Sequence, residues 1–227
     1  MKLSVIIPLY NEKTTIFKVI EKVRAVSLEK EIIIVDDFSI DGTRDAIKVL
    51  ENDSDIKIAY HDKNRGKGAA IRTAIELITG DIVVIQDADL EYEPNDYLEL
   101  VKPIMEGTAS IVYGSRQLGM SSGRSHVSFY LGGRFLTILT NLLYGSNITD
   151  EPTCYKVFKA DLLTTISLKC KRFEFCPEVT AKVLKRGIPI VETPIHYYPR
   201  KKSEGKKIRW KDGVHAMWTL FKYRFID

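Results

Sequence analysis

The chain has 227 residues, of which 44% are apolar and 28% are charged. This balance is ordinary for a globular domain and excludes collagen-like, intrinsically disordered and disulfide-scaffold proteins. No apolar stretch reaches the roughly 18 residues that a membrane-spanning helix needs, because Arg134 interrupts the best one, at residues 130–144.

Charge is unevenly distributed along the chain. The net charge is +4, but residues 194–227 carry nine Lys or Arg against three Asp or Glu, a local charge of +6. Such a basic end suits an anionic partner, such as a phosphate, a lipid headgroup or a nucleic acid, and it is also compatible with an ordinary solvated surface. Because no nucleic-acid reading module accompanies it, we expect no nucleic-acid partner.

The cysteines and the first residues indicate the compartment. The three cysteines, Cys154, Cys170 and Cys176, include no Cys-x-x-Cys pair, which disfavours a disulfide framework or a zinc site. Residues 1–12 lack the pattern of a secretory signal peptide. We therefore expect reduced cysteines and a cytoplasmic location.

The first half of the chain alternates between strand and helix patterns. We expect strands at residues 2–9, 31–35, 56–60 and 81–86, and helices at residues 14–26, 43–50 and 68–78. Strands of continuous Ile and Val, separated by helices of about a dozen residues, are typical of βαβ units. The pattern predicts an α/β fold with a doubly wound, mostly parallel sheet flanked by helices.

The second half is less regular. We expect a strand at 110–113, a mobile loop rich in Gly, Ser and Arg at 114–125, a helix at 127–144, extended chain at 154–158, a helix at 177–186 closed by Gly187, and a strand at 188–195. A last helix is indicated by Val214, Met217, Trp218, Phe221 and Phe225 at helical spacing. These apolar residues suit a membrane interface or packing on the core, and the two can coexist. Since no repeat or linker appears, we treat residues 1–227 as one domain.

Acidic residues follow two of the predicted strands. Asp36-Asp37 and Asp87-Ala88-Asp89 fall at the carboxyl ends of strands, where open α/β sheets place their ligands. Asp87 and Asp89 are two residues apart, so in extended chain both can face one cation. Their oxygens suit Mg²⁺ or Mn²⁺, and Glu91 can add another oxygen directly or through water. A lone Asp-x-Asp is more often a strand-end turn, but the second acidic cluster favours the metal site.

Other motifs mainly exclude functions. The sequence N-R-G-K-G at 64–68 opens a helix and is either a phosphate cradle or an ordinary glycine turn. The chain has neither a P-loop nor a Gly-x-Gly-x-x-Gly fingerprint, which removes the main support for an ATPase or a dehydrogenase. Its four histidines are isolated and no nucleophile elbow is present, so we expect structural histidines and no hydrolase.

Taken in order, several segments resemble a known family. They are V-I-I-P-L-Y-N-E at 5–12, V-D-D-F-S-I-D-G-T at 35–43, N-R-G-K-G at 64–68, Asp81, D-A-D at 87–89 and G-S-R at 114–116. This set resembles family 2 glycosyltransferases of the GT-A fold, in particular the group of dolichol-phosphate mannose synthases and polyprenyl-phosphate glycosyltransferases. Residues 150–158 and 174–178 also resemble blocks of that group, so the resemblance covers essentially the whole chain.

The resemblance implies a role for each matching residue. It implies a nucleotide-sugar-binding part at residues 1–116 and an acceptor-binding part with the basic C-terminal segment at residues 117–227. In the first part, the implied donor contacts are Pro8, Tyr10, Glu12, Asp37, Lys67 and Asp87, and the implied metal ligands are Asp87, Asp89 and Glu91. Asp89, Arg116 and Arg200 are implied to act in catalysis, with Arg116 on the donor phosphates and Arg200 closing over the site.

The acceptor side matches the family less closely. Arg124 and Ser128 have the spacing of an acceptor-phosphate pair, and Arg134 is a further cation in this part. Phe38 stands where a glycine is common, Glu91 where a glutamine is common, and Thr153-Cys154-Tyr155 replaces Ser-Gly-Phe/Tyr. These departures leave the metal geometry and the acceptor open.

We therefore expect a metal-dependent, inverting transfer of a hexose, mannose or glucose, from a GDP- or UDP-sugar to a polyprenyl or dolichyl phosphate. An ionised acceptor phosphate needs no strong general base, which suits a chain without an obvious catalytic histidine. The enzyme would act at the cytoplasmic face of a membrane, as a peripheral protein or through a membrane protein partner.

Two alternatives remain open. Transfer to a soluble saccharide would need a carboxylate base, for which Asp150 and Glu178 are available. A non-catalytic nucleotide-sugar-binding regulatory module is also conceivable, but intact Asp87, Asp89 and Arg116 argue against it.

Overall fold

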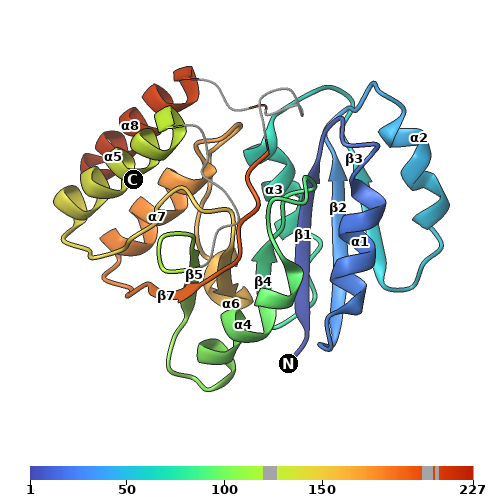
Figure 1. The fold of residues 1–227 in the computed structure, drawn as a ribbon, viewed down its shortest axis with the longest axis horizontal. Coiled ribbons are helices and arrows are strands. Elements are labelled where there is room, and N and C mark those ends of the chain that lie inside the picture. Colours follow the sequence, from blue (N-terminus) through green and yellow to red (C-terminus); the bar gives the residue numbers. More distant parts are fainter. Residues whose placement is uncertain (120–126, 201–206, 208–209, 227) are drawn as a thin grey trace.

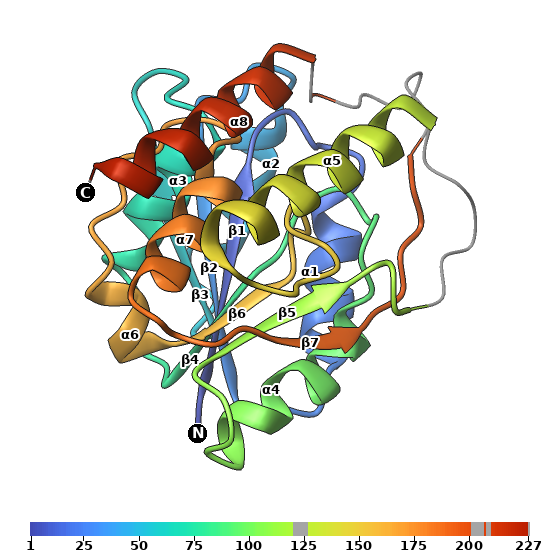
Figure 2. The same ribbon diagram turned by 90° about the vertical axis from the view of Figure 1, so that its left-hand side faces the viewer.

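The computed structural model describes residues 1–119, 127–200, 207 and 210–226. Its centre is a seven-stranded sheet with helices on both faces (Figures 1 and 2). The strands are β1 Leu3–Leu9, β2 Lys30–Asp36, β3 Ile56–Tyr60, β4 Ile82–Ile85, β5 Ile111–Ser115, β6 Lys156–Lys159 and β7 Val191–Pro194. The helices are α1 Ile16–Ala25, α2 Thr43–Ile47, α3 Lys67–Ile75, α4 Tyr97–Met105, α5 Val127–Tyr144, α6 Ala160–Thr164, α7 Phe175–Lys185 and α8 Trp210–Phe225, with 3₁₀ turns η1 Lys48–Leu50 and η2 Pro94–Asp96.

The sheet has the order β3-β2-β1-β4-β6-β5-β7. All neighbouring strands are parallel except β6, which runs antiparallel to both β4 and β5. The chain goes outward from β1 through β2 to β3 and then returns to place β4 on the other side of β1. This reversal puts a topological switch point between β1 and β4, where such sheets bind ligands at their carboxyl ends.

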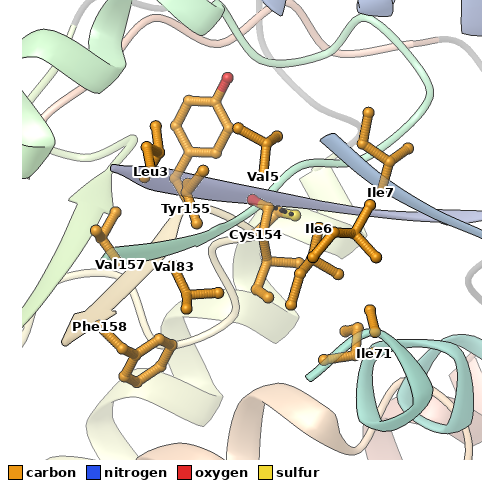
Figure 3. Packing of buried hydrophobic residues seen from close by; sticks show 14 of the residues in the cluster. Leu3, Val5, Ile6, Ile7, Ile71, Val83, Cys154, Tyr155, Val157 and Phe158 are labelled. Carbon is orange, nitrogen blue, oxygen red and sulfur yellow. Dashed lines mark hydrogen bonds between the residues drawn. The ribbon is translucent and has the colours of Figure 1, made fainter. Parts of the chain in front are cut away.

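The core lies around the central strands. The side chains of β1, β2 and β4 are almost all buried, because helices cover both faces of the sheet. Figure 3 shows Ile6, Ile71 and Val83 of this core together with Cys154 and Tyr155. The doubly wound α/β fold predicted from the sequence is confirmed.

The predicted boundaries differ from the structure at several places. The elements up to β4 agree within three residues, whereas α4 and α6 were not predicted, and the residues expected as extended at 154–155 precede β6. Helix α4 contains Pro103, which disfavours a helix, but its apolar residues Leu100, Val101 and Ile104 are buried and stabilise it. Gly114 and Ser115, expected in a loop, belong to β5, and most of that loop lies outside the described residues.

The sequence left open whether the apolar residues of α8 pack on the core or form a surface, and the structure exposes most of them. Helices α5, α7 and α8 pack on one another beside the sheet, with α5 and α8 side by side (Figures 1 and 2). The residues of α8 that pack inward are Ala216, Leu220 and Tyr223. Trp218 and Phe225, which set the predicted spacing, are 67% and 79% exposed. The aromatic face of α8 is therefore a surface.

Glu31 is a buried carboxylate at the amino-terminal edge of the sheet, far from the switch point. It accepts hydrogen bonds from the Ser4 hydroxyl (2.6 Å) and from the Thr79 amide (2.6 Å) and hydroxyl (2.8 Å), and it pairs with Lys57 at 2.9 Å. Burial opposes its ionisation, but these partners outweigh burial and hold the pKa of Glu31 well below its usual range. Glu31 thus connects β1, β2, β3 and the turn before β4.

Replacing this carboxylate tests its contribution to stability. We expect Glu31→Gln to lower the free energy of unfolding at pH 7 by about 2 kcal/mol, because charge-assisted hydrogen bonds are lost. A lowered folded-state pKa stabilises the fold above the unfolded pKa of about 4.3, and this contribution is lost as the pH falls below that value. In urea unfolding, the difference in the free energy of unfolding between wild type and variant should be smaller at pH 3 than at pH 7. An equal difference at both pH values would contradict this account.

Candidate functional site

A cleft of about 730 Å³ opens at the switch point between β1 and β4. One half is lined by Pro8, Tyr10 and Asp37, which follow or end the first strands. The other half is lined by residues of the later helices, including Phe175 and Ala216. Asp87 and Asp89 lie between the two halves in the chain that follows β4, so the predicted acidic motif is part of the cleft.

Asp87 is paired with a lysine from the start of α3. Its carboxylate contacts the ammonium of Lys67, the first residue of that helix. The preceding Gly66 has a φ of +92°, and an added Cβ would lie 2.4 Å from the Lys171 carbonyl oxygen. Only glycine fits there, so the glycines of the 64–68 motif shape the turn that delivers Lys67 to Asp87.

Asp89 is paired with Arg200 from the opposite end of the chain. The guanidinium of Arg200 lies 3.0 Å from Asp89 Oδ2 and donates to both carboxylate oxygens of Glu12 at 3.1 Å. Burial, together with repulsion from Asp87 and Glu91, raises the pKa of Asp89 to about 7 despite the nearby Arg200. Negative charge is therefore concentrated at Asp89 and only partly neutralised.

Glu91 does not join the other two carboxylates as a third ligand. Its carboxylate accepts hydrogen bonds from the Tyr197 hydroxyl (2.9 Å) and from the Arg200 backbone amide (2.7 Å). Among the described residues, no three His, Cys, Asp or Glu side chains converge in a group that could hold a metal. The three-carboxylate set therefore stays a prediction, and in this arrangement Glu91 positions the segment that carries Arg200.

Asp87 and Asp89 nevertheless fit a divalent cation. Two carboxylates together with the oxygens of a bound diphosphate form the all-oxygen set that Mg²⁺ and Mn²⁺ prefer. Burial, together with the charges of Asp87 and Glu91, raises the pKa of Asp89, and a bound cation would favour its ionised form. The donor chemistry thus agrees with a metal held by these two residues together with its ligand.

Asp37 is buried in the wall of the cleft. Its oxygens already accept hydrogen bonds from His61 Nδ1 (2.7 Å) and from the backbone amides of Arg65 (2.8 Å) and Gly66 (2.7 Å). His61 is buried and also contacts the Thr73 hydroxyl, which confirms its structural role. Asp37 therefore fixes the loop at 64–66, and its contact with a nucleotide remains a prediction.

Lys207 belongs to the cleft, although the sequence placed it in a basic tail. Its ammonium lies 2.8 Å from Glu12 Oε1 and also contacts the Tyr10 carbonyl oxygen. Glu12 thus holds two cations from the C-terminal segment, Arg200 and Lys207. No local signal in the sequence distinguishes Lys207 from its neighbouring lysines, because its partners lie almost two hundred residues away.

Arg116 is held by Asp150 in a two-pronged ion pair. Its Nε and Nη2 donate to the two oxygens of Asp150 at 2.7 Å each, and its backbone amide donates to the same carboxylate at 2.9 Å. The guanidinium also lies 5.0 Å from the centre of the Tyr197 ring. Arg116 lines the cleft, but its charge is already paired.

Both carboxylates that could serve as a general base are occupied. Asp150 is bound to Arg116, as described above. Glu178, in α7, accepts hydrogen bonds from the backbone amides of Lys169 (2.8 Å) and Cys170 (2.6 Å) and pairs with Lys182. These bonds hold the pKa of Glu178 below its usual range although burial opposes them. Neither is arranged to take a proton from an acceptor.

The predicted acceptor-phosphate residues are not brought together at the cleft. Arg124 lies outside the described residues. Ser128 is exposed near the start of α5, and Arg134 donates to the Thr149 carbonyl oxygen at 3.4 Å. Neither Ser128 nor Arg134 is among the residues that line the cleft. Their contact with an acceptor phosphate stays a prediction, and the residue of α5 that lines the cleft is Leu136.

Comparison with known proteins gives a consistent result. The family model described as glycosyl transferase family 2 matches residues 4–166. The chain is 30% identical to the UDP-N-acetylglucosamine–dolichyl-phosphate N-acetylglucosaminyltransferase of Methanococcus voltae, over 84% of this chain and 83% of that protein. It is 28% identical to the undecaprenyl-phosphate mannosyltransferase of Micrococcus luteus, over 99% of both chains.

Other relatives are longer than this chain. The low-salt glycan biosynthesis hexosyltransferase Agl6 of Haloferax volcanii is 29% identical over 99% of this chain, which spans about half (53%) of that protein. Among solved structures, glucosyl-3-phosphoglycerate synthase from Mycobacterium tuberculosis, in complex with Mn²⁺, UDP and its product, has a TM-score of 0.76 at 21% identity. That likeness covers all of this chain and 81% of the other, and it confirms the GT-A fold.

Proposed function

The chain belongs to glycosyl transferase family 2, and we propose that it transfers a hexose from a nucleotide sugar to a polyprenyl or dolichyl phosphate. Two relatives that align with most of this chain are named for transfer to dolichyl phosphate or undecaprenyl phosphate. The donor is a GDP- or UDP-sugar. Different features of the cleft support the choice of acceptor and the binding of the donor.

The observation that carries the choice of acceptor is the state of the carboxylates. A saccharide hydroxyl must lose a proton as it attacks, whereas an acceptor phosphate is already ionised near neutral pH. Asp150 and Glu178, the two carboxylates that the sequence indicated for this role, are both tied in ion pairs. A phosphate acceptor needs neither of them. In the proposed reaction a phosphate oxygen bonds to the anomeric carbon while the bond to the diphosphate breaks, so the anomeric configuration inverts.

Donor binding is assigned to the half of the cleft beside β1 and β2. Pro8 and Tyr10 form the wall for the base, Glu12 lies near the ribose, and Asp37 fixes the loop beside them. Lys67 is placed to approach the diphosphate. Mg²⁺ or Mn²⁺, held by Asp87 and Asp89, would neutralise the charge that develops on the leaving diphosphate. Residues 1–116 thus form the donor part and residues 117–227 the acceptor part of one domain.

The cations around the cleft have separate proposed roles. Arg200 is paired with carboxylates and can exchange these partners for the donor phosphates once a metal binds to them. Arg116, held rigidly by Asp150, presents a fixed positive charge to the reacting phosphates. Asp89, Arg116 and Arg200 are therefore the proposed catalytic residues.

We further propose that the outer faces of α5 and α8 bind an anionic membrane surface, which would bring the lipid acceptor to the cleft. The exposed apolar residues there are Tyr130, Leu131, Phe135, Ile138 and Leu142 on α5, and Trp210, Val214, Trp218, Phe221 and Phe225 on α8. The inner sides of the same helices contribute Leu136 and Ala216 to the cleft. None of the helices in the described part of the chain is long and apolar enough to cross a membrane. A cytoplasmic-face, peripheral location fits this surface.

A panel of donors and acceptors tests the reaction. UDP-glucose, UDP-N-acetylglucosamine and GDP-mannose are each incubated with a short polyprenyl phosphate or with a soluble saccharide, and the products are identified by mass spectrometry. We expect a glycosylated polyprenyl phosphate, formed only with Mg²⁺ or Mn²⁺, and a loss of at least ~10²-fold in turnover for Asp89→Asn. Transfer to the saccharide alone, or full turnover in excess chelator, would contradict the proposal.

The membrane surface is tested by a triple variant, Leu142→Ser, Trp218→Ser and Phe225→Ser. Each of these exposed side chains can gain about 1.5–3 kcal/mol on burial, so their loss should weaken binding to anionic liposomes far more than ~10-fold. The matched control replaces Ile40 and Val49 with serine. Both are also exposed, Ile40 in the chain before α2 and Val49 within η1, and α2 lies at the opposite end of the molecule from α5 and α8 (Figure 1). The rate of transfer to a short, water-soluble polyprenyl phosphate should stay unchanged in both variants. If the triple variant floats with liposomes as wild type does, this surface is not the membrane contact.

A further inference from the structure

Glu151 and Thr153 form a buried polar pair without partners. Four buried side-chain polar atoms in the described part of the chain lack a hydrogen-bond partner, and three of them are the two carboxylate oxygens of Glu151 and the hydroxyl of Thr153. Both residues are fully buried. The fourth atom is Arg200 Nε. Glu151 lines the cleft, and Thr153 lies in the same segment, between the cleft-lining residues Pro152 and Cys154.

The absence of partners for Glu151 is unusual because such groups are costly to bury. Burial raises the pKa of Glu151, and this is opposed only in part by the positive charge of Lys156 and by the nearby Thr180 hydroxyl, which is itself hydrogen-bonded to Tyr113. The Lys156 ammonium donates at 2.6 Å to the backbone carbonyl of Glu151, not to its carboxylate, and lies 3.6 Å from the centre of the Tyr113 ring. The neighbouring lysine thus leaves the carboxyl group available.

The fold satisfies buried carboxylates elsewhere. Glu31 is equally buried and has hydrogen-bond or ion-pair partners on both of its oxygens. In the cleft itself, Glu12, Asp89 and Glu91 are all partnered. Glu151 therefore differs from the other acidic groups of the same site, and its unmet hydrogen bonds call for a ligand that supplies them.

Glu151 is held in place beside the carboxylate pair. Its backbone is fixed by a hydrogen bond that the Glu151 amide donates to the Thr137 hydroxyl of α5 at 3.0 Å. Three residues further on, Cys154 Sγ lies 3.8 Å from the Lys67 ammonium that binds Asp87. The segment from Glu151 to Cys154 therefore runs along the cleft from α5 to the proposed diphosphate site.

We propose that Glu151 and Thr153 bind hydroxyl groups of the sugar that is transferred. This rests on the proposed function, in which the nucleotide occupies the half of the cleft at Pro8 and Asp37. The sugar, attached to the diphosphate, then extends past Asp87 toward Glu151. A hydroxyl can both donate to and accept from a carboxyl group in either protonation state, whereas the ionised form would repel an acceptor phosphate. A site built for a hydroxyl strongly discriminates against a sugar that lacks it.

Nucleotide and sugar recognition are separated by calorimetry. UDP is compared with UDP-glucose and UDP-N-acetylglucosamine, and GDP with GDP-mannose, for Glu151→Gln, Glu151→Met and Thr153→Val. We expect the affinity for UDP or GDP to stay within about twofold of wild type. For the nucleotide sugar that wild type uses, kcat/KM should fall at least ~10-fold, as expected when a hydrogen bond to a substrate hydroxyl is lost.

Stability measurements exclude a merely structural role. Glu151→Met removes an unpartnered carboxyl group and keeps most of its volume, so its Tm should equal or exceed that of wild type. Glu31→Gln is the matched control and should behave oppositely, with a lower Tm and unchanged kcat/KM. A gain in stability together with a loss of sugar recognition is the pattern expected for a binding residue.

Three outcomes would overturn the inference. One is kcat/KM within twofold of wild type in the Glu151 and Thr153 variants. Another is an equal loss of affinity for the free nucleotide and the nucleotide sugar. The third is a loss of kcat in Glu151→Gln with KM for the donor unchanged, which would place Glu151 on the acceptor. If wild type transfers no sugar to a polyprenyl phosphate, the proposed function fails, whereas wild-type transfer with unaffected variants rejects only the sugar contact.

Discussion

Three carboxylates from two separate segments of the chain converge on Arg200. Its guanidinium binds Glu12 and Asp89, and its backbone amide donates to Glu91. Burying so much negative charge at one end of a sheet is unfavourable unless cations accompany it. Arg200 meets this requirement from the C-terminal part of the chain, so that part must return across the ends of β1 and β4. The closure of the cleft and its charge balance thus have the same cause.

The same constraint connects the two parts of the domain. The first part provides the acidic strand ends and Lys67, and the second provides Arg116, Arg200 and the helices that wall the far half of the cleft. Lys67 is paired with Asp87, and Arg200 with Asp89. A metal ion can bind the carboxylates of these pairs, and a diphosphate can bind their cations.

The sequence predicted what depends on local pattern. Continuous Ile and Val predicted the parallel strands, and the position of Asp87 and Asp89 after one of them predicted the site. It did not predict α4, because Pro103 masked a helix that tertiary burial stabilises. It left open whether the aromatic residues of α8 pack on the core or form a surface, because helical spacing does not say which face is inward. The roles of Glu91, Lys207 and the Arg116–Asp150 pair depend on contacts between distant segments, and no local signal encodes them.

The account depends most on the exchange of these ion pairs for a metal and a diphosphate. The measurement that tests it most directly is the affinity of the protein for UDP and for GDP by calorimetry, with Mn²⁺ and with a chelator. Because the metal must screen Asp87 and Asp89 before Lys67 and Arg200 can turn to the diphosphate, the preferred nucleotide should bind at least ~10-fold more tightly with Mn²⁺. Equal affinity with and without the metal, or no binding of either nucleotide, would contradict the account.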